Sequence, residues 1–379
     1  MGMTSRERLL CVLNGKIPDH VPVAPDTSNM IPAKLTGKPF WDLYLYQDPP
    51  IWQAYIDCVK HFGFDSLMDG YVPILFDELG EIDHEWIEAI VFKNNERIVT
   101  RRYKKALTKR VWEDTVTVYY RDNPPSHGIT PSAIKLPDIP PSYEEIEGTR
   151  EWPRGETLLK YVKNELGDHG LVGVFCGTSL MLNNDKDILD YYDNPEKYEE
   201  KRDALLIQYK KRFEKLMSLE CQPDFICTGG SGTLVFQSPQ IFTDLALPIV
   251  KQMTMLCKQA GIPSHIHSCG PEKELVKIAA LETDLTVIDP LEVPPMGNCD
   301  LKELKRLYGN KLVLKGNLHT TKVMLFGSVK DVIDASKRAI DDAAEGGGFI
   351  LSTGDQCGRD TPEENIFAMI ETAKTYGKY

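Results

Sequence analysis

Residues 264–289 read SHIHSCGPEKELVKIAALETDLTVID, and this stretch contains the pattern that decides the fold. It begins with a short strand-like run at Ser264–Ser268 and continues with an amphipathic helical pattern at Glu272–Leu281. A second apolar run follows at Leu285–Asp289. A strand, a helix and a strand in this order predict two parallel strands joined by a crossover helix.

The same alternation extends along the chain and predicts its architecture. Helical sequence separates most of the strand-like runs, and the helical stretch Asp187–Leu219 is too long for one ordinary helix. Eight such units, with no Gly-x-Gly-x-x-Gly opening the first, predict a single-domain (β/α)₈ TIM barrel over residues 1–379 rather than an open doubly wound sheet. The predicted strands are Val21–Pro25, Ser66–Gly70, Gly170–Cys176, Asp224–Thr228, Ser264–Ser268, Leu285–Asp289, Lys311–Lys315 and Gly348–Thr353.

Residues 71–168 interrupt the alternation after the second predicted strand. Ile90–Thr100 and Val116–Arg121 alternate like antiparallel strands, and several prolines break the chain around them. We predict an inserted antiparallel, proline-rich segment. Because barrel enzymes keep their active sites at the carboxyl ends of the strands, we expect this segment to cover the site and to contribute aromatic contact area.

Composition narrows the class of protein. The chain has 379 residues, of which 42% are hydrophobic and 26% charged, as in an ordinary globular protein. A formal net charge of −12 disfavours nucleic acid and anionic lipid as partners. With no signal-like or membrane-spanning apolar run and nine scattered cysteines, the sequence predicts a cytoplasmic protein with reduced thiols.

Soft metal ligands follow two of the predicted strands. His265, His267 and Cys269 are spaced two apart and therefore face the same way, and His267 and Cys269 come at the strand end. Cys357 follows the last strand, which a closed barrel brings to the same rim. One imidazole and two thiolates with an open position predict a catalytic zinc site made by His267, Cys269 and Cys357. The plainer alternative is a core histidine beside a buried cysteine.

Three further side chains at the same rim are candidate catalytic residues. Asp289 and Glu292 follow the sixth strand and could act as ligand, base or second-shell partner, although Asp289 could equally cap a turn before Pro290. His319 follows the seventh strand, where a surface loop histidine is as plausible. The glycine-rich segment Gly229–Thr233 fits no phosphate-loop spacing and is expected to allow close approach of a bulky ligand.

With these residues in place, the chain resembles the uroporphyrinogen decarboxylase superfamily along nearly its whole length. The resemblance implies a (β/α)₈ barrel. Its pieces are Arg6-Glu7-Arg8, Pro18–Val23, Ser238–Phe242, Leu247-Pro248, His267–Gly270, Asp289-Pro290, Gly316–Leu318 and Thr361–Ile366.

The match is better to one branch of this superfamily than to the decarboxylase itself. The decarboxylase carries an arginine-rich segment near its amino end, whereas here no basic residue occurs between Asp26 and Lys34. The chain resembles the cobamide-dependent methyltransferases, in which the positions of His267, Cys269 and Cys357 hold zinc. It departs from their thiol-methylating members, whose last cysteine directly follows a glycine, because Asp355-Gln356 separates Gly354 from Cys357.

The resemblance implies an enzyme that moves a methyl group from a small methyl donor, here expected to be a methoxylated aromatic compound, to a cobamide. The cobamide is expected on a separate corrinoid protein, since this chain has no Asp-x-His-x-x-Gly pattern. A Lewis-acidic zinc ion would lower the barrier by taking up charge on the departing oxygen. The alternatives are a methylcobamide:thiol methyltransferase and a uroporphyrinogen-decarboxylase-like lyase, with a zinc hydrolase or a purely ligand-binding barrel beyond these.

Overall fold

The computed structural model describes residues 2–105, 110–182, 184–230, 234 and 237–379, and the chain divides into two compact units. The first unit comprises residues 1–26, 59–73 and 159–379, and the second comprises residues 27–58 and 74–158. The second unit therefore contains most of the predicted insertion and also residues 27–58. None of the helices in the described part of the chain is long and apolar enough to cross a membrane.

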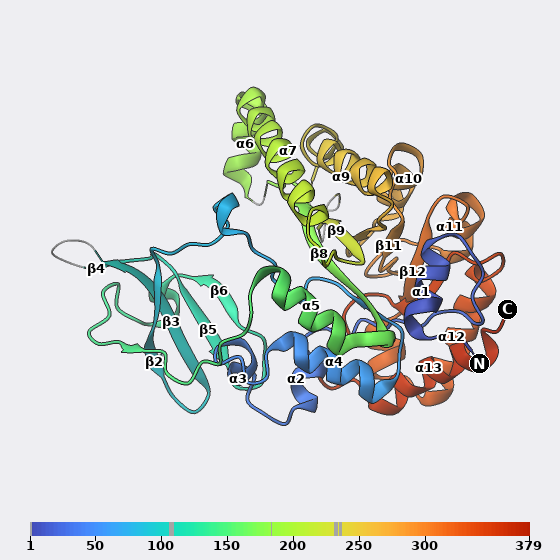
Figure 1. Ribbon diagram of the computed structural model, residues 1–379, viewed down its shortest axis with the longest axis horizontal. Helices are drawn as coiled ribbons and strands as arrows, with labels where there is room; N and C mark the ends of the chain where they lie inside the picture. Colours follow the sequence, from blue (N-terminus) through green and yellow to red (C-terminus); the bar gives the residue numbers. More distant parts are fainter. Residues whose placement is uncertain (1, 106–109, 183, 231–233, 235–236) are drawn as a thin grey trace. The chain divides into compact units, whose positions relative to one another are not determined.

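The first unit is built on a parallel sheet of seven strands (Figure 1). The strands pair in the order of the chain, with no exchange of neighbours, so each crossover leads to the adjacent strand. The strands are β1 (Ser66–Met68), β8 (Gly170–Thr178), β9 (Phe225–Gly229), β10 (Ser264–His267), β11 (Val287–Asp289), β12 (Val313–Leu318) and β13 (Phe349–Thr353). Each of them overlaps a predicted strand.

The segment predicted as the first strand, Val21–Pro25, forms backbone hydrogen bonds on both sides, to β13 and to the residue just before β1. Val23 makes a parallel bridge to Leu351 of β13, and the backbone N–H of Ala24 donates to the Leu351 carbonyl at 2.9 Å. On the other side, the N–H of Asp65, just before β1, donates to the Val23 carbonyl at 2.8 Å. The segment thus lies between β13 and the start of β1.

The helices follow the strands in the expected alternation, and α1 and α9 to α13 surround the parallel strands in Figure 1. The α-helices are α1 (Ser5–Leu13), α2 (Met30–Leu35), α3 (Phe40–Tyr44), α4 (Ile51–Phe62), α5 (Gly155–Leu166), α6 (Asp185–Asp193), α7 (Pro195–Met217), α8 (Pro239–Ile241), α9 (Leu247–Ala260), α10 (Lys273–Glu282), α11 (Leu301–Tyr308), α12 (Val329–Ala343) and α13 (Glu363–Tyr376). Short 3₁₀ helices occupy Asp77–Leu79, Pro131–Ile134 and Gly167–His169, and π-helices occupy Phe242–Ala246 and Thr320–Leu325.

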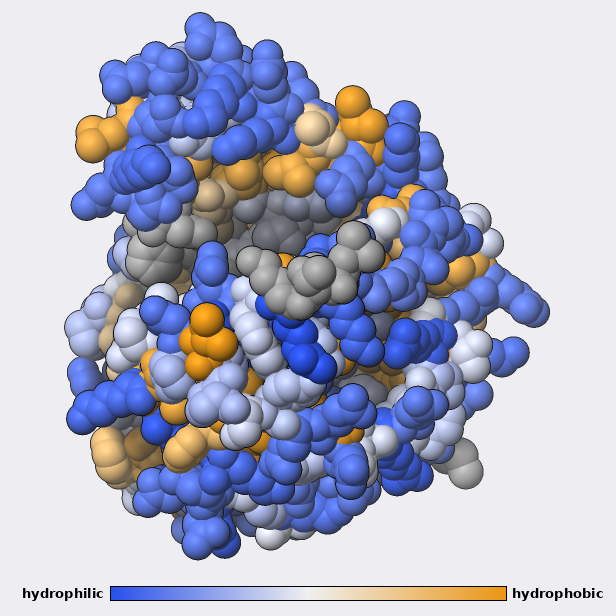
Figure 2. Space-filling model, turned by 90° about the vertical axis from the view of Figure 1, so that its left-hand side faces the viewer, coloured by the Kyte–Doolittle hydropathy of each residue, from blue (hydrophilic) through white to orange (hydrophobic). Residues whose placement is uncertain are grey.

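The long helical stretch predicted at 187–219 is two helices. Pro195 separates α6 from α7, since proline is compatible with a first helical turn but not with the interior of a continuing helix. Tyr198, Phe213 and Leu216 are the buried residues of α7. The surface around α6 and α7, at the top of Figure 2, is mainly hydrophilic, as expected for amphipathic helices rich in Lys and Glu.

The side chains on the inner face of the strands are apolar near the start of each strand and polar near its carboxyl end. Phe225, Val287 and Val313 belong to one buried apolar cluster, which Leu9, Val12 and Leu13 of α1 cover. Two residues further along β11 and β12, the side chains change to Asp289 and Lys315. Because residues two apart share a face of a strand, the polar side chains lie toward the carboxyl ends of the strands.

The second unit contains an antiparallel sheet, as predicted. The predicted strand Ile90–Thr100 is in fact a hairpin of two strands, because Asn94-Asn95-Glu96 turns the chain and Asn94 Oδ1 accepts hydrogen bonds from the N–H groups of Glu96 and Arg97. The strands are β2 (Ile87–Lys93), β3 (Arg97–Lys105), β4 (Arg110–Trp112), β5 (Val116–Tyr120), β6 (Ser126–Ile129) and β7 (Glu144–Glu145). Trp112 packs against Tyr103 and Tyr143 within this unit.

A partly buried ion pair fixes the amino-terminal helix to the parallel sheet. Arg6 of α1 donates to both carboxylate oxygens of Asp224, at 2.6 and 3.0 Å, and Lys163 Nζ lies 2.9 Å from the same carboxylate. Burial would raise the pKa of Asp224, but the hydrogen bonds from Arg6, the Val172 N–H and Lys163 outweigh it and hold the pKa below the ordinary value of 3.8. The ionised carboxylate therefore contributes to stability.

We expect Asp224→Asn to lower the free energy of unfolding by about 1–3 kcal/mol, because it leaves the partly exposed Arg6 and Lys163 without their charged partner. In the unaltered protein this contribution is complete above pH 3.8 and is lost as the pH falls toward the lower pKa of the folded state. Urea unfolding at several pH values measures both effects. The exposed Asp203→Asn serves as the control and should change stability by less than about 1 kcal/mol. Equal losses in the two variants would contradict the assignment.

Candidate metal centre

Four neighbouring strands bring polar side chains together at their carboxyl ends. His267 is the last residue of β10, Asp289 the last of β11, and Lys315 lies in β12. The register pairs His267 directly with Asp289. Asp355 lies two residues beyond the end of β13.

His267, Cys269 and Asp355 form a compact group of ligand-type side chains. The Nε2 atom of His267 lies 3.2 Å from Cys269 Sγ and 3.5 Å from Asp355 Oδ1, and the Cys269 thiol lies 3.5 Å from the same oxygen. One ligand atom from each residue falls within 4.8 Å of the other two. Nitrogen, sulfur and oxygen at this spacing are a donor set suited to zinc.

Asp289 orients the histidine of this group from behind. Its Oδ1 lies 3.3 Å from His267 Nδ1 and 2.8 Å from His265 Nε2, and its Oδ2 accepts a hydrogen bond from Lys315. Burial would raise the pKa of Asp289, but Lys315, His265 and His267 hold it well below its usual range. A carboxylate that binds one ring nitrogen and leaves the other free for a ligand is the usual support of a metal-bound histidine.

The electrostatics keep both acidic partners of His267 ionised. Burial would lower the pKa of His267, but Asp289 and Asp355 raise it well above its ordinary value. Burial likewise would raise the pKa of Asp355, and the hydrogen bonds from His267 and the Gln356 N–H lower it instead. The backbone of Asp355 has a φ of +107°, which is uncommon for a residue with a side chain and concentrates strain at this loop.

Glu292, one of the predicted catalytic residues, lies beside the same group. It is 5% exposed, and Oε2 accepts a hydrogen bond from the N–H of Gly270, the residue that follows Cys269. Burial and the charge of Asp355 raise the pKa of Glu292, while the Gly270 N–H and His267 act in the opposite direction. Glu292 is therefore the carboxyl group of this site whose pKa is shifted upward, whereas those of Asp289 and Asp355 are shifted downward.

Cys357, predicted as the third ligand, lies deeper than Asp355. It is fully buried, and its N–H donates to the Asp26 carbonyl at 2.9 Å. Burial and Asp26 raise the pKa of its thiol to about 12. Among the described residues, its sulfur is not part of the group within 4.8 Å, whereas Asp355 is. Asp355 directly follows Gly354, the position that the resemblance gives to the last cysteine of the thiol-methylating enzymes.

The structure gives His319 a local role. Its Nδ1 accepts hydrogen bonds from the N–H groups of Thr321 and Lys322, so it caps the π-helix that follows β12. A catalytic role for His319 stays a prediction. Of the glycine-rich segment 229–233, residues 231–233 lie outside the described part of the chain.

Sequence reasoning missed Lys315 and Asp355. Lys315 ends a predicted strand, and its place two residues beyond apolar Val313 was a usable signal that it points into the same interior as Asp289. Asp355 could have been found from its position directly after Gly354.

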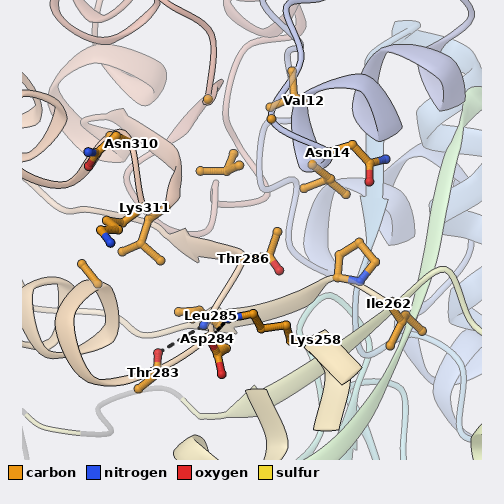
Figure 3. A pocket seen from close by; sticks show the side chains of 18 of the residues that line it. Val12, Asn14, Lys258, Ile262, Thr283, Asp284, Leu285, Thr286, Asn310 and Lys311 are labelled. Atoms are coloured by element: carbon orange, nitrogen blue, oxygen red, sulfur yellow. Dashed lines mark hydrogen bonds and ion pairs between the residues drawn. The ribbon is translucent and has the colours of Figure 1, made fainter. Parts of the chain in front are cut away.

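A cavity of about 590 Å³ lies at the other end of the strands (Figure 3). Its lining includes Val12, Lys258, Ile262, Asp284 and Lys311, which come from α1, from the end of α9 and from the segments before β10, β11 and β12. Since His267 and Asp289 are the last residues of their strands, this cavity is remote from the metal-ligand group. The amino-terminal face of such sheets generally serves stability rather than chemistry.

A known family matches the part of the chain that contains the His267 group. Residues 220–376 match the profile described as uroporphyrinogen decarboxylase (URO-D). Over these residues, which make up less than half of the chain, the sequence is similar to that family. This confirms the resemblance predicted from the sequence, and the matched range contains His267, Cys269, Asp289, Glu292 and Asp355. No curated protein matches the chain.

Solved structures add a likeness of fold. A methyltransferase from Methanosarcina mazei superposes with a TM-score of 0.61 at 16% sequence identity and covers 99% of both chains. A B12-independent methionine synthase from Shewanella sp. W3-18-1, solved with selenomethionine, has a TM-score of 0.37 at 12% identity and covers 60% of this chain and 67% of its own. The structure from Methanosarcina mazei therefore shares its fold with this chain over nearly the whole length of both chains.

Two of the family-like motifs have clear structural roles. Ser238 accepts a hydrogen bond from the Ile241 N–H and so caps α8, with Pro239 in its first turn. Asn365 donates from Nδ2 to the carbonyls of Met324 and Gly327, both at 2.9 Å, and ties α13 to the loop after β12. Ser238 and Asn365 thus hold elements of the scaffold in place.

We expect Asp289→Asn to weaken metal binding by about 10–100-fold, because a neutral amide holds the ring of His267 less firmly. Competition with a chromogenic chelator measures this affinity. The change also leaves Lys315 buried without a counter-charge, so the double variant Asp289→Asn/Lys315→Met separates the two effects. It should regain stability but not metal affinity. Unchanged affinity in both variants would show that Asp289 does not orient a ligand.

Proposed function

We propose that this chain is a zinc-dependent methyltransferase, with the eight-stranded (β/α)₈ barrel closed by residues 21–25 as its scaffold. It would move a methyl group from a small methoxylated donor to the cobamide of a separate corrinoid protein. The observation that carries this proposal is the group His267, Cys269 and Asp355 with Asp289 behind the histidine. The methyltransferase-like fold and the uroporphyrinogen decarboxylase match of residues 220–376 support it.

The residues present fit a zinc ion. His267 Nε2, Cys269 Sγ and Asp355 Oδ1 would hold it, which leaves an open position as in catalytic zinc sites. The buried carboxylate Asp289 supplies the outer support that metal-bound histidines have. In this assignment Asp355 takes the place proposed for Cys357 from the sequence.

The donor set favours demethylation over methylation of a thiol. When bound, a zinc ion with one thiolate, one carboxylate and one imidazole acts as a Lewis acid that stabilises negative charge on a departing oxygen. Thiolate-rich coordination donates more electron density and suits a bound nucleophilic sulfur instead. Asp355, a hard oxygen donor in place of a second thiolate, thus supports a methoxyl substrate.

Glu292 provides the proton that the reaction consumes. Removal of a methyl group by a cobalt(I) cobamide leaves an alkoxide or phenoxide, which needs one proton to depart as the alcohol. Burial raises the pKa of Glu292, which favours the acid form of its carboxyl beside Asp355 and His267. General acids of this kind contribute about 10²–10⁴-fold to rate.

The proposal is tested by mixing the protein, a reduced corrinoid protein and a panel of donors. The panel contains methoxylated aromatic compounds, methanol and methylamines, and the absorbance change from cobalt(I) to methylcobalt is recorded. Conversion with a methoxylated donor supports the proposal. Methyl transfer only in the reverse direction, from methylcobalt to a thiol, would favour the thiol methyltransferase. Loss of carbon dioxide from a porphyrinogen without any cobamide would favour the lyase.

A further inference from the structure

A second group of ligand-type side chains lies deeper in the parallel sheet, and the proposed function does not use it. Asp69 follows β1, Cys227 lies in β9 and His265 lies in β10, one ligand atom from each within 4.8 Å of the other two. The strand register places Cys227 directly beside His265. Cys227 and His265 are 1% and 2% exposed, whereas the Asp69 side chain is 29% exposed and lies on the open side of the group.

His265 presents a free ring nitrogen to this group. Its Nε2 lies 2.8 Å from Asp289 Oδ1, which fixes the proton on that side of the ring. Its Nδ1 is buried and has no hydrogen-bond partner among the described residues, and the Asp69 carboxylate is 3.6 Å away. A buried histidine with one nitrogen on a carboxylate and the other unpartnered has the orientation of a metal ligand.

The charges around this group favour a cation. Lys315 is paired with Asp289, and Asp26 and Asp69 add further negative potential at its ammonium group. His267 adds positive charge beside Asp289, so the attraction for a cation comes from the carboxylate of the group itself, Asp69, which lies 3.6 Å from His265 Nδ1.

We propose that Asp69, Cys227 and His265 form a second metal site, which binds a borderline divalent cation such as Zn²⁺ or Co²⁺. A site with one sulfur, one nitrogen and one oxygen donor does not suit Mg²⁺ or Ca²⁺, because these ions prefer oxygen ligands. This site and the His267 group share Asp289, whose Oδ1 contacts one histidine of each. Asp289 is thus a positioning residue for two metal sites.

Binding at this site releases a proton. Burial and the charges of Asp69 and Asp289 raise the pKa of the Cys227 thiol well above its usual value, while the Gly70 N–H lowers it by bonding to the sulfur. On binding, the S–H bond of Cys227 breaks, a sulfur–metal bond forms and the proton leaves to solvent.

Cobalt titration tests the site without any activity assay. The protein is stripped with a chelator, titrated with Co²⁺, passed through a desalting column and assayed for metal and for sulfur-to-cobalt charge-transfer absorption. We expect two cobalt ions per wild-type chain and one in each of Asp69→Asn, Cys227→Ala and Cys269→Ala. The double variant Cys227→Ala/Cys269→Ala should bind none. The control Cys257→Ala, which removes an equally buried thiol outside both groups, should keep two.

The outcomes separate this inference from the proposed function. A single cobalt ion in the wild type that is lost in Cys269→Ala but kept in Cys227→Ala and Asp69→Asn would overturn the second site and leave the first intact. Two ions in the wild type and in both Asp69→Asn and Cys227→Ala would also overturn it. Because Asp69 is partly exposed and asparagine has the same shape, Asp69→Asn provides the test if Cys227→Ala fails to fold.

Discussion

Cys269→Ala is expected to remove the metal of the His267 group and to abolish methyl transfer. The group has one sulfur donor, Cys269, and its loss leaves His267 and Asp355, two donors that rarely hold zinc alone. We expect a loss of at least about 10³-fold in zinc affinity, since structural and catalytic zinc sites gain several kcal/mol from each ligand. Zinc content after dialysis against a chelator, with cobamide methylation as the second readout, measures the effect.

The matched comparison is between Asp355→Asn and Cys357→Ser. If Asp355 is the third ligand, Asp355→Asn weakens zinc binding and Cys357→Ser leaves it unchanged, because the Cys357 thiol is buried and protonated outside the group. If Cys357→Ser lost the metal and Asp355→Asn kept it, the ligand set His267, Cys269 and Cys357 predicted from the sequence would be right. Thermal unfolding of each variant checks that the fold is retained.

Glu292→Gln is expected to lower the rate of methyl transfer by about 10²–10⁴-fold while zinc content is retained. The amide keeps the size of the side chain and can still accept the hydrogen bond from the Gly270 N–H, but it carries no acidic proton. The effect should fall on kcat rather than on the affinity for the donor.

The leaving group provides the control for this prediction. A donor that releases a more acidic phenol needs less protonation, so the deficit of Glu292→Gln should shrink as the phenol becomes more acidic. A constant deficit for all donors would indicate that Glu292 positions the site instead. An unchanged rate would remove Glu292 from the mechanism.

The fold could be predicted because each buried strand of the parallel sheet is a short apolar run between helical patterns. β10, α10 and β11 follow the pattern of residues 264–289 almost residue by residue. The hairpin of β2 and β3 was less clear, because the turn at Asn94–Glu96 contains neither glycine nor proline. The division of the helical stretch 187–219 into α6 and α7 at Pro195 was indicated in the sequence only because the stretch is too long for one ordinary helix.

The grouping of these side chains could be predicted in part. His267 and Cys269 were predicted to face the same way because side chains alternate along a strand, and Asp289 and Glu292 were predicted at the same rim because they end or follow the next strand; the structure places the four close together. The proximity of Asp355 to His267 and Cys269 could not be read from spacing, since Asp355 and Cys357 lie in one irregular loop after β13, where the backbone of Asp355 has a positive φ. Long-range pairs such as Asp289 with Lys315 depend on strand register, which a single sequence specifies weakly.

The most direct test of the account is the rate of cobamide methylation as a function of zinc content. The metal-free protein is reloaded with increasing zinc and mixed with a methoxylated aromatic donor and a reduced corrinoid protein, while Cys269→Ala is treated in parallel. We predict that the formation of methylcobalt rises in proportion to the zinc bound at the Cys269-dependent site and is absent in Cys269→Ala. Full methylation by the zinc-free protein, or by Cys269→Ala, would contradict the account.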